Sequence, residues 1–180
     1  MNTAQPLRSK REINAIKNAL HGRDRLFFIL AINTGLRVSD LLRLKVGDVR
    51  GKTTITLREQ KTGKAKQFRL NKAVKDAVKT LVPADAADDD CLFKSRKGGN
   101  RPISRVQVFR RLNEAAARAG LNRQLSPHSL RKTFGYFAYK QGVDISLLMS
   151  IFNHSSEKMT LRYIGIEQDD IDNVYETLNL

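Results

Sequence analysis

The sequence has few of the residues that cross-link chains or bind metals. Its 180 residues include one cysteine, Cys91, and three histidines. A single cysteine excludes an internal disulfide, and so few Cys and His side chains leave no cluster with metal-ligand spacing. This composition suits a reducing compartment, so we expect a cytoplasmic protein without a bound metal.

Long apolar runs are also missing. The longest, from Leu26 to Ile32, is far too short to cross a bilayer, and the polar amino terminus lacks the apolar region of a signal peptide. No Gly/Ser-rich or Pro-rich block suggests a linker. With 41% hydrophobic residues over this length, the chain can bury a real core, and we expect a single domain over residues 1–180 and no membrane partner.

Acidic residues are outnumbered by basic ones. The chain has 18 Asp and Glu against 33 Lys and Arg, which gives a formal charge of +15 and a pI near 10.3. Such an excess most often serves a polyanion, and nucleic acid is the leading candidate. An anionic membrane surface is a weaker candidate, because no segment shows a basic amphipathic stripe that lacks another role.

The sequence pattern predicts a mostly helical α+β fold. Ser9 and Glu12 form a capping-box pattern that opens a helix over about 10–21. A more apolar helix then runs from Asp24 to a glycine C-cap at Gly35 and is expected to be central to the core. Alternating β-branched segments at 54–57 and 67–70 predict one antiparallel hairpin with a basic tip. Further helices are expected after Asn71, Ser104, Ser126, Asp144 or Ser146, and Ser156.

The segment Ser126-Pro127-His128-Ser129-Leu130-Arg131 predicts a helix start with two functional side chains on one face. Ser126 is placed as the N-cap and Pro127 at the first helical position. His128 and Arg131 then share a face in the first turn, where free backbone N–H groups favour an anion such as phosphate. The alternative is a partly buried histidine beside a salt-bridging arginine.

Four further positions accompany this pair. Arg37 stands between two apolar helices at the start of a short new helix; its alternative role is a local pair with Asp40. Lys61 lies in the hairpin turn, whose lysines would otherwise be a solvated hairpin end. His154 follows a short apolar helix, and Tyr163 comes before Gly165, which interrupts the next helix.

These six positions, Arg37, Lys61, His128, Arg131, His154 and Tyr163, resemble in order and context the catalytic set of the tyrosine recombinases, the phage integrase family. Arg37 lies in the segment Thr-Gly-Leu-Arg, and His128 and Arg131 lie in the segment Pro-His-Ser-Leu-Arg-Lys. The resemblance covers nearly the whole chain. It implies the tyrosine recombinase catalytic-domain fold and no cofactor. Of the three hairpin lysines, Lys61 matches best. The family usually has Leu-Gly-His where this chain has Phe152-Asn153-His154. Because asparagine replaces the glycine, we expect that the tight turn before His154 can differ in shape.

The residue types fit metal-free cleavage of a DNA phosphodiester. Arg37 and Arg131 can grip the non-bridging oxygens with forked donors. Tyr163 would attack the phosphorus to form a 3′-phosphotyrosyl link, and Lys61 would protonate the leaving 5′ oxygen. His128 would act as acid or base near the tyrosine, and His154 would donate a hydrogen bond to the phosphate. Tyr136 and Tyr139 are expected in the core and Tyr175 in the apolar stripe of the tail.

The resemblance also implies double-stranded DNA as partner and self-association on it, with a tetrameric synapse. It leaves the oligomeric state of the free protein open, with a monomer as one possibility. We expect a tail helix over about 166–180 that docks on a neighbouring subunit, and we expect the family's amino-terminal DNA-clamp domain to be absent. Candidates for contacts with the DNA backbone are Lys64, Lys66, Lys94, Arg96, Lys97, Arg101, Arg105 and Lys132.

The favoured function is site-specific recombination or integration. A type IB topoisomerase uses the same residues and would relax a plasmid that lacks any target site. A DNA-binding regulator with the fold but no activity is the third possibility. It is disfavoured because a pure binder has no use for a tyrosine beside two arginines and two histidines.

Overall fold

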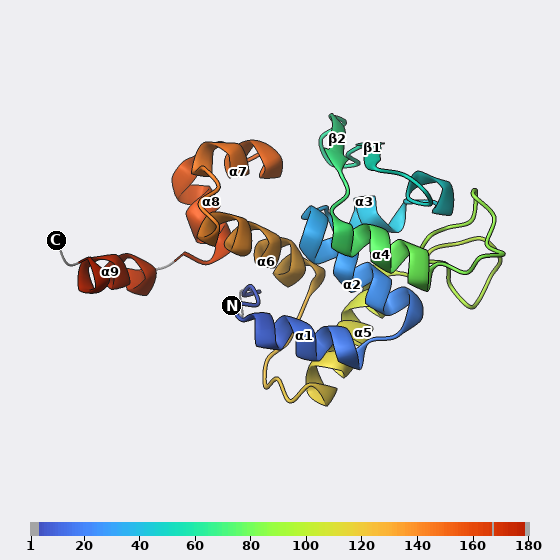
Figure 1. Ribbon diagram of the computed structural model, residues 1–180, viewed down its shortest axis with the longest axis horizontal. Helices are drawn as coiled ribbons and strands as arrows, with labels where there is room; N and C mark the ends of the chain where they lie inside the picture. Colours follow the sequence, from blue (N-terminus) through green and yellow to red (C-terminus); the bar gives the residue numbers. More distant parts are fainter. Residues whose placement is uncertain (1–3, 167, 179–180) are drawn as a thin grey trace.

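The structure is a computed structural model that describes residues 4–166 and 168–178. Helices dominate it, with one two-stranded antiparallel sheet (Figure 1). The elements are α1 (Lys10–Ala19), α2 (Gly22–Thr34), α3 (Val38–Leu42), a 3-10 turn η1 (Val46–Asp48), β1 (Thr54–Arg58), β2 (Ala65–Arg69), α4 (Lys72–Leu81), α5 (Arg105–Arg118), α6 (Pro127–Lys140), α7 (Ile145–Phe152), α8 (Glu157–Ile164) and α9 (Gln168–Thr177). The expectation of a mostly helical α+β fold is confirmed.

The helix boundaries follow the capping residues of the sequence. Ser9, Asn71 and Ser104 each accept a hydrogen bond from a backbone N–H in the first turn of the helix that they open. Of the two candidate caps for α7, Asp144 makes the capping hydrogen bond. Gly35 ends α2 in the left-handed conformation, with φ of 59°. Local chemistry thus sets most boundaries within a residue or two.

The main core is built around α2. This helix packs against α1, α3, α4 and α6, and its side chains Phe27, Phe28 and Leu30 are almost completely buried. Helices α1 and α5 pack together beside it. The prediction that the apolar helix after Asp24 is central to the core is confirmed, because a helix with apolar residues nearly all round can be stable only when neighbours cover every face.

The hairpin pairs β1 with β2 from Thr54–Arg69 to Arg58–Ala65. Only Ile55 of its strand residues is fully buried; Leu57 and Phe68 pack partly against the main core. In Figure 1 the hairpin projects beyond α3 and α4. The turn residues 60–64 are exposed, whereas Glu59, which follows Arg58, is buried among residues of other elements.

Helices α7 and α8 form a separate small cluster on the second half of α6. Leu148, Phe152 and Ile164 are its fully buried residues. Gly135 of α6 allows the close approach: a Cβ there would lie 2.5 Å from Ile164 and 2.7 Å from Phe152. Figure 1 shows α7 and α8 on the side of α6 away from α4 and the loops that follow it. The chain thus has two unequal hydrophobic cores that share α6.

The tail contains the expected helix, α9, which extends away from the rest of the chain (Figure 1). Tyr175 and Leu178 are 80% and 61% exposed, so these two members of the predicted apolar stripe contact nothing that buries them. The side chains of Ile171 and Val174 lie outside the described ones. Within residues 4–166 and 168–178, no helix is both long and apolar enough to span a membrane.

Candidate active site

Arg131 is the most deeply buried cation of the site. Ser126 caps α6 and Pro127 follows, so His128 and Arg131 emerge from the first turn as predicted. Arg131 is 4% exposed; its Nη1 donates to the carbonyl of Gly35 and its Nη2 to that of Phe152 at 3.4 Å. The guanidinium also lies 4.7 Å from the ring centre of Phe152. These contacts fix it between the end of α2 and the end of α7.

Arg37 reaches the same place from the other side. It is the N-cap residue of α3, just after the left-handed turn at Gly35. Its Nη2 donates to the carbonyl of Phe152 at 3.4 Å, and its Nη1 lies 2.9 Å from a carboxylate oxygen of Glu59. Asp40 instead accepts from the backbone N–H of Gln60 at 2.9 Å. The alternative of a local Arg37–Asp40 pair is therefore not the arrangement found.

A pocket of about 330 Å³ lies in front of the two arginines. Its lining consists of Arg37, Val38, Ser39, Gln60, Lys61, Arg105, Pro127, His128 and Arg131. Four of the six predicted catalytic residues thus come from α3, the hairpin turn and α6 to one concave surface. A larger hollow of about 600 Å³ beside the amino-terminal segment is lined by none of the six. Cationic donors around a small hollow are suited to a phosphate.

The hairpin lysines are separated by the fold. Lys61 is exposed and lines the pocket. Lys66 is turned inward: its Nζ donates to the carbonyl of Ile151 at 2.9 Å and lies 3.6 Å from Glu59. Burial and the charge of Arg131 lower the pKa of Lys66, although Glu59 opposes that change. Lys64 is exposed and fits the alternative of a solvated hairpin end.

His154 and Tyr163 lie together on the other side of Arg131. Their ring centres are 4.9 Å apart, and the Tyr163 ring lies 5.3 Å from that of Phe152. His154 Nδ1 is 3.1 Å from the hydroxyl oxygen of Thr160. Burial raises the pKa of Tyr163, while the charge of Arg131 and a hydrogen bond from it act in the opposite direction. The phenol is thus placed next to a guanidinium that also lines the pocket.

The two histidines resist protonation. Burial lowers the pKa of His128, and the nearby charges of Arg131, Lys132 and Arg105 lower it further. Burial, followed by the charges of Arg131 and Arg37, lowers the pKa of His154. Both imidazoles are therefore neutral near pH 7, because their ordinary pKa is already about 6.5. A neutral imidazole can accept a proton as well as donate a hydrogen bond.

Asn153 makes a left-handed turn at the end of α7. It is the one non-glycine residue of the described chain with a positive φ, and φ 56° and ψ 49° place it in the left-handed region. Asparagine tolerates this conformation better than most residues. Asn153 therefore makes a left-handed turn before His154, a conformation that glycine also adopts readily.

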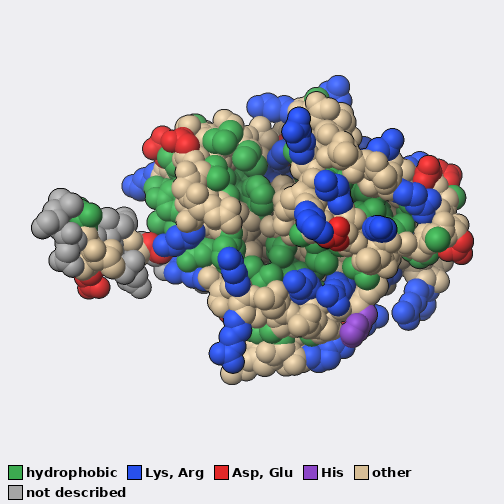
Figure 2. All heavy atoms as spheres, in the orientation of Figure 1, with side chains coloured by type: hydrophobic (Ala, Val, Ile, Leu, Met, Phe, Trp, Pro, Cys, Tyr) green, Lys and Arg blue, Asp and Glu red, His purple; other side chains and the backbone are tan. Residues whose placement is uncertain are grey.

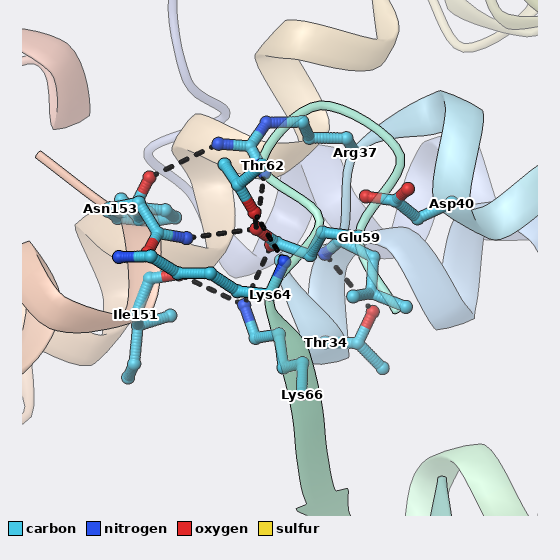
Figure 3. Close-up of polar contacts among 12 residues, drawn as sticks. Thr34, Arg37, Asp40, Glu59, Thr62, Lys64, Lys66, Ile151 and Asn153 are labelled. Atoms are coloured by element: carbon cyan, nitrogen blue, oxygen red, sulfur yellow. Dashed lines mark hydrogen bonds and ion pairs between the residues drawn. The ribbon is translucent and has the colours of Figure 1, made fainter. Parts of the chain in front are cut away.

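Glu59 is the site residue that the sequence analysis missed. It is 1% exposed and touches Arg37, Thr62, Lys66 and Asn153 (Figure 3). The available signal was a lone acidic residue at the end of a strand, within the strongly basic stretch 58–66. Nothing in that stretch indicates which distant side chains it meets.

The other tyrosines and the DNA-backbone candidates differ in how far their side chains are exposed. Tyr136 is buried and Tyr139 packs on the small cluster, as expected, whereas Tyr175 is exposed. Lys94 is paired with Asp90 at 2.8 Å, and Lys132 lies 5.4 Å from the Tyr163 ring. Lys66 makes the internal contacts given above. The exposed DNA-backbone candidates are Lys64, Lys94, Arg96, Lys97, Arg101 and Arg105.

Comparison with known proteins agrees with this geometry. The model of the phage integrase family matches residues 8–169. A probable integrase/recombinase, YoeC of Bacillus subtilis, is 40% identical over 179 residues, which cover 98% of this chain and 97% of that protein. A phenol near two guanidinium groups is the arrangement that the sequence analysis expected of a phosphoryl-transfer site. The chain belongs to the phage integrase family, the tyrosine recombinases.

Solved structures share the fold at lower identity. A crystal structure of XerA recombinase superposes with a TM-score of 0.80 at 22% identity, covering 99% of this chain and 66% of that one. A lambda integrase dimer bound to a COC′ core site superposes with a TM-score of 0.68 at 21% identity, covering 93% of this chain and 51% of that one. The chain also spans about half of the curated XerA of Pyrococcus furiosus, at 55% of its length. The expected catalytic-domain fold is confirmed.

Proposed function

We propose that this protein is a site-specific DNA recombinase or integrase that breaks and rejoins strands through a 3′-phosphotyrosyl intermediate. The observation that carries the proposal is the placement of Arg131. It lines the pocket of about 330 Å³, and its charge and a hydrogen bond from it act to lower the pKa of Tyr163. A phosphate held in the pocket would therefore lie within reach of a nucleophile that is already oriented by the same guanidinium.

Arg37 and Arg131 would bind the non-bridging oxygens of the scissile phosphate. Their planar donors suit the charge that accumulates as the phosphorus becomes five-coordinate. Both are held by backbone carbonyls, so they need little reorganisation when DNA arrives. Losing either should cost roughly 3 kcal/mol of transition-state stabilisation or more, by comparison with the loss of one oxyanion donor.

The proton transfers can be balanced with the residues of this chain. As the Tyr163 oxygen forms its bond to phosphorus, neutral His128 accepts the phenol proton. As the bond from phosphorus to the 5′ oxygen breaks, Lys61 at the pocket supplies a proton to that oxygen, and His154 donates a hydrogen bond to the phosphate. Rejoining reverses these steps. The covalent link retains the bond energy, so the proposed reaction needs neither ATP nor a metal.

The surface supports double-stranded DNA as the substrate. Figure 2 shows Lys and Arg side chains spread over much of one face, with few acidic groups, in keeping with the charge of +15. The lambda integrase of similar fold is bound to DNA as a dimer. We propose that this chain likewise assembles on DNA in the cytoplasm, as a tetrameric synapse in which α9 docks on a neighbouring subunit, and is a monomer when free.

The test is capture of the covalent intermediate. Nicked duplexes with a randomised core are incubated with the protein, and DNA that stays attached under denaturing conditions is sequenced to define the site. On that site, Tyr163→Phe should abolish the covalent band and leave DNA binding intact, because only the attacking oxygen is lost. Tyr175→Phe, in the exposed tail, is the matched control and should retain the band.

Other outcomes point to the other functions. A covalent band with Tyr163→Phe would mean that another residue is the nucleophile. Relaxation of a plasmid without the selected site would indicate a topoisomerase. Binding without any adduct from the wild-type protein would indicate a DNA-binding regulator.

A further inference from the structure

A buried carboxylate lies at the centre of the cationic site. The Oε2 atom of Glu59 is 2.9 Å from Arg37 Nη1, and it accepts hydrogen bonds from the Thr62 hydroxyl at 2.7 Å and from Asn153 Nδ2 at 2.9 Å. The Oε1 atom is 3.6 Å from Lys66 Nζ. Figure 3 shows these side chains converging on Glu59 from separate elements. One carboxylate therefore connects the start of α3, the hairpin and the turn between α7 and α8.

The end of α7 completes this arrangement. The carbonyl of Ile151 accepts from Lys66, and that of Phe152 accepts from both Arg37 and Arg131. Carbonyls at a helix carboxyl end lack partners within the helix and attract cations. Three cations therefore meet the last turn of α7, and Asn153 immediately follows it. The position of α7 and the positions of the arginines depend on each other.

The charge of Glu59 suits this position. An unpaired buried carboxylate would be costly, but this one has hydrogen-bond donors and two cations around it. Burial raises the pKa of Glu59, and the hydrogen bond from Thr62 with the charges of Arg37 and Lys66 outweighs that effect and lowers it overall. The negative charge of ionised Glu59 also offsets the repulsion among Arg37, Lys66 and Arg131 when no DNA is bound.

Asn153 performs two tasks at one position. Its backbone makes the left-handed turn before His154, which glycine could also make. Its side-chain amide then donates to Glu59, which glycine could not do. The amide therefore adds a direct link between the hairpin that carries Lys61 and the segment that carries His154.

We propose that Glu59 and Asn153 form a positioning pair for strand cleavage. The pair holds Arg37 against the end of α7 and fixes the hairpin relative to the His154 turn, so that groups on the two cores meet one phosphate. Neither residue touches the reacting atoms. This inference rests on the proposed function, since it assigns the two residues a part in that reaction.

Exchanging the two functional groups tests the pair. Asn153→Asp places a second carboxylate beside that of Glu59, so that the two repel each other. Glu59→Gln removes the negative charge that holds Arg37. Each single variant should slow single-turnover adduct formation by up to about a hundredfold, the effect of a misplaced catalytic group. The double variant, Glu59→Gln with Asn153→Asp, regains one amide donor and one carboxylate and should cleave faster than Asn153→Asp alone.

Two further variants refine the measurement. Asn153→Gly keeps the turn and loses only the amide, so its rate should fall roughly two- to tenfold, the equivalent of one hydrogen bond. Asp76→Asn, which removes an exposed charge on α4, is the control and should cleave like the wild type.

The pH dependence separates positioning from simple structural support. In Asn153→Asp the neighbouring charge raises the pKa of one carboxyl group. At low pH that group is protonated, and its O–H can donate to Glu59 as the amide did. The rate of this variant relative to the wild type should therefore rise as pH falls. Circular dichroism at each pH gives the folded fraction, and a recovery of rate at constant folded fraction reports positioning and not stability.

Folding and function are followed separately. A double-mutant cycle on the free energy of unfolding, measured without DNA, should show favourable coupling between positions 59 and 153. Absence of coupling, or wild-type cleavage rates in both single variants, would overturn the proposed pair. If the wild-type protein forms no adduct, the proposed function fails, whereas the unfolding cycle still decides whether the pair exists.

Discussion

The two hydrophobic cores differ greatly in size, and they carry different parts of the active site. The main core contains the buried faces of α1, α2, α4 and α5, whereas the core of α7 and α8 has only Leu148, Phe152 and Ile164 fully buried. Arg37, Lys61 and His128 stand on the large core; His154 and Tyr163 stand on the small one. Because buried apolar area supplies most of the stability, we expect the part that carries Tyr163 to open at the lower free energy.

From this difference we expect the proposed site to have a firmer half and a more movable half. The cationic pocket is prebuilt, so it can bind a phosphate without reorganisation. In the proposed reaction Tyr163 approaches the phosphate for cleavage and leaves it after rejoining, and we expect the small core to permit that movement. Arg131 on α6, the carbonyl of Phe152 and the Glu59–Asn153 hydrogen bond lie at the boundary and couple the halves.

The largest effect is expected in the main core. Phe28 is 0% exposed, and Phe28→Ala should lower the free energy of unfolding by about 3–5 kcal/mol through lost burial and a cavity. Chemical denaturation followed by circular dichroism measures this loss.

Leu148→Ala in the small core should instead mainly speed hydrogen exchange within 145–164. Equal acceleration of exchange in α2 would contradict the division into two halves.

An intermediate effect is expected where the small core meets α6. Gly135→Ala places a methyl group where Phe152 and Ile164 already lie, and overpacking of this kind costs about 1–3 kcal/mol. Because these neighbours bracket His154 and Tyr163, adduct formation should fall while DNA affinity is retained. The check is a filter-binding assay beside the cleavage assay. A loss of affinity as large as the loss of cleavage would mean that the pocket is disturbed as well.

The smallest effect is the response of stability to pH. The pKa values of His128 and His154 are lowered in the folded protein, so below about pH 6.5 the unfolded chain binds more protons than the folded one. The stability that these neutral histidines contribute is complete above that pH and is lost as pH falls through their folded pKa values. Thermal unfolding midpoints from neutral to acidic pH should show this decline, and His154→Gln should reduce it. An unchanged decline in both His154→Gln and His128→Gln would assign it to other groups.

Much of the site could be predicted because its signals are local. Ser126 and Pro127 fix the phase of α6, so the shared face of His128 and Arg131 follows from the sequence. The left-handed cap at Gly35 likewise follows from one residue type. Contacts between distant segments carry no such signal. Glu59 and Asn153 are 94 positions apart, and nothing near Lys66 in the sequence indicates that its side chain turns inward to meet Ile151.

The sequence by itself determined the helix boundaries, the hairpin and the excess of positive charge, because caps, turns and periodicity act over a few positions. Its resemblance to the tyrosine recombinases supplied the six candidate catalytic residues. Only the tertiary structure decided which lysine lines the pocket, that Arg37 pairs with Glu59 and not with Asp40, and that His154 and Tyr163 rest on a separate small core. Those outcomes depend on burial and on charges brought together by packing, which no single segment encodes.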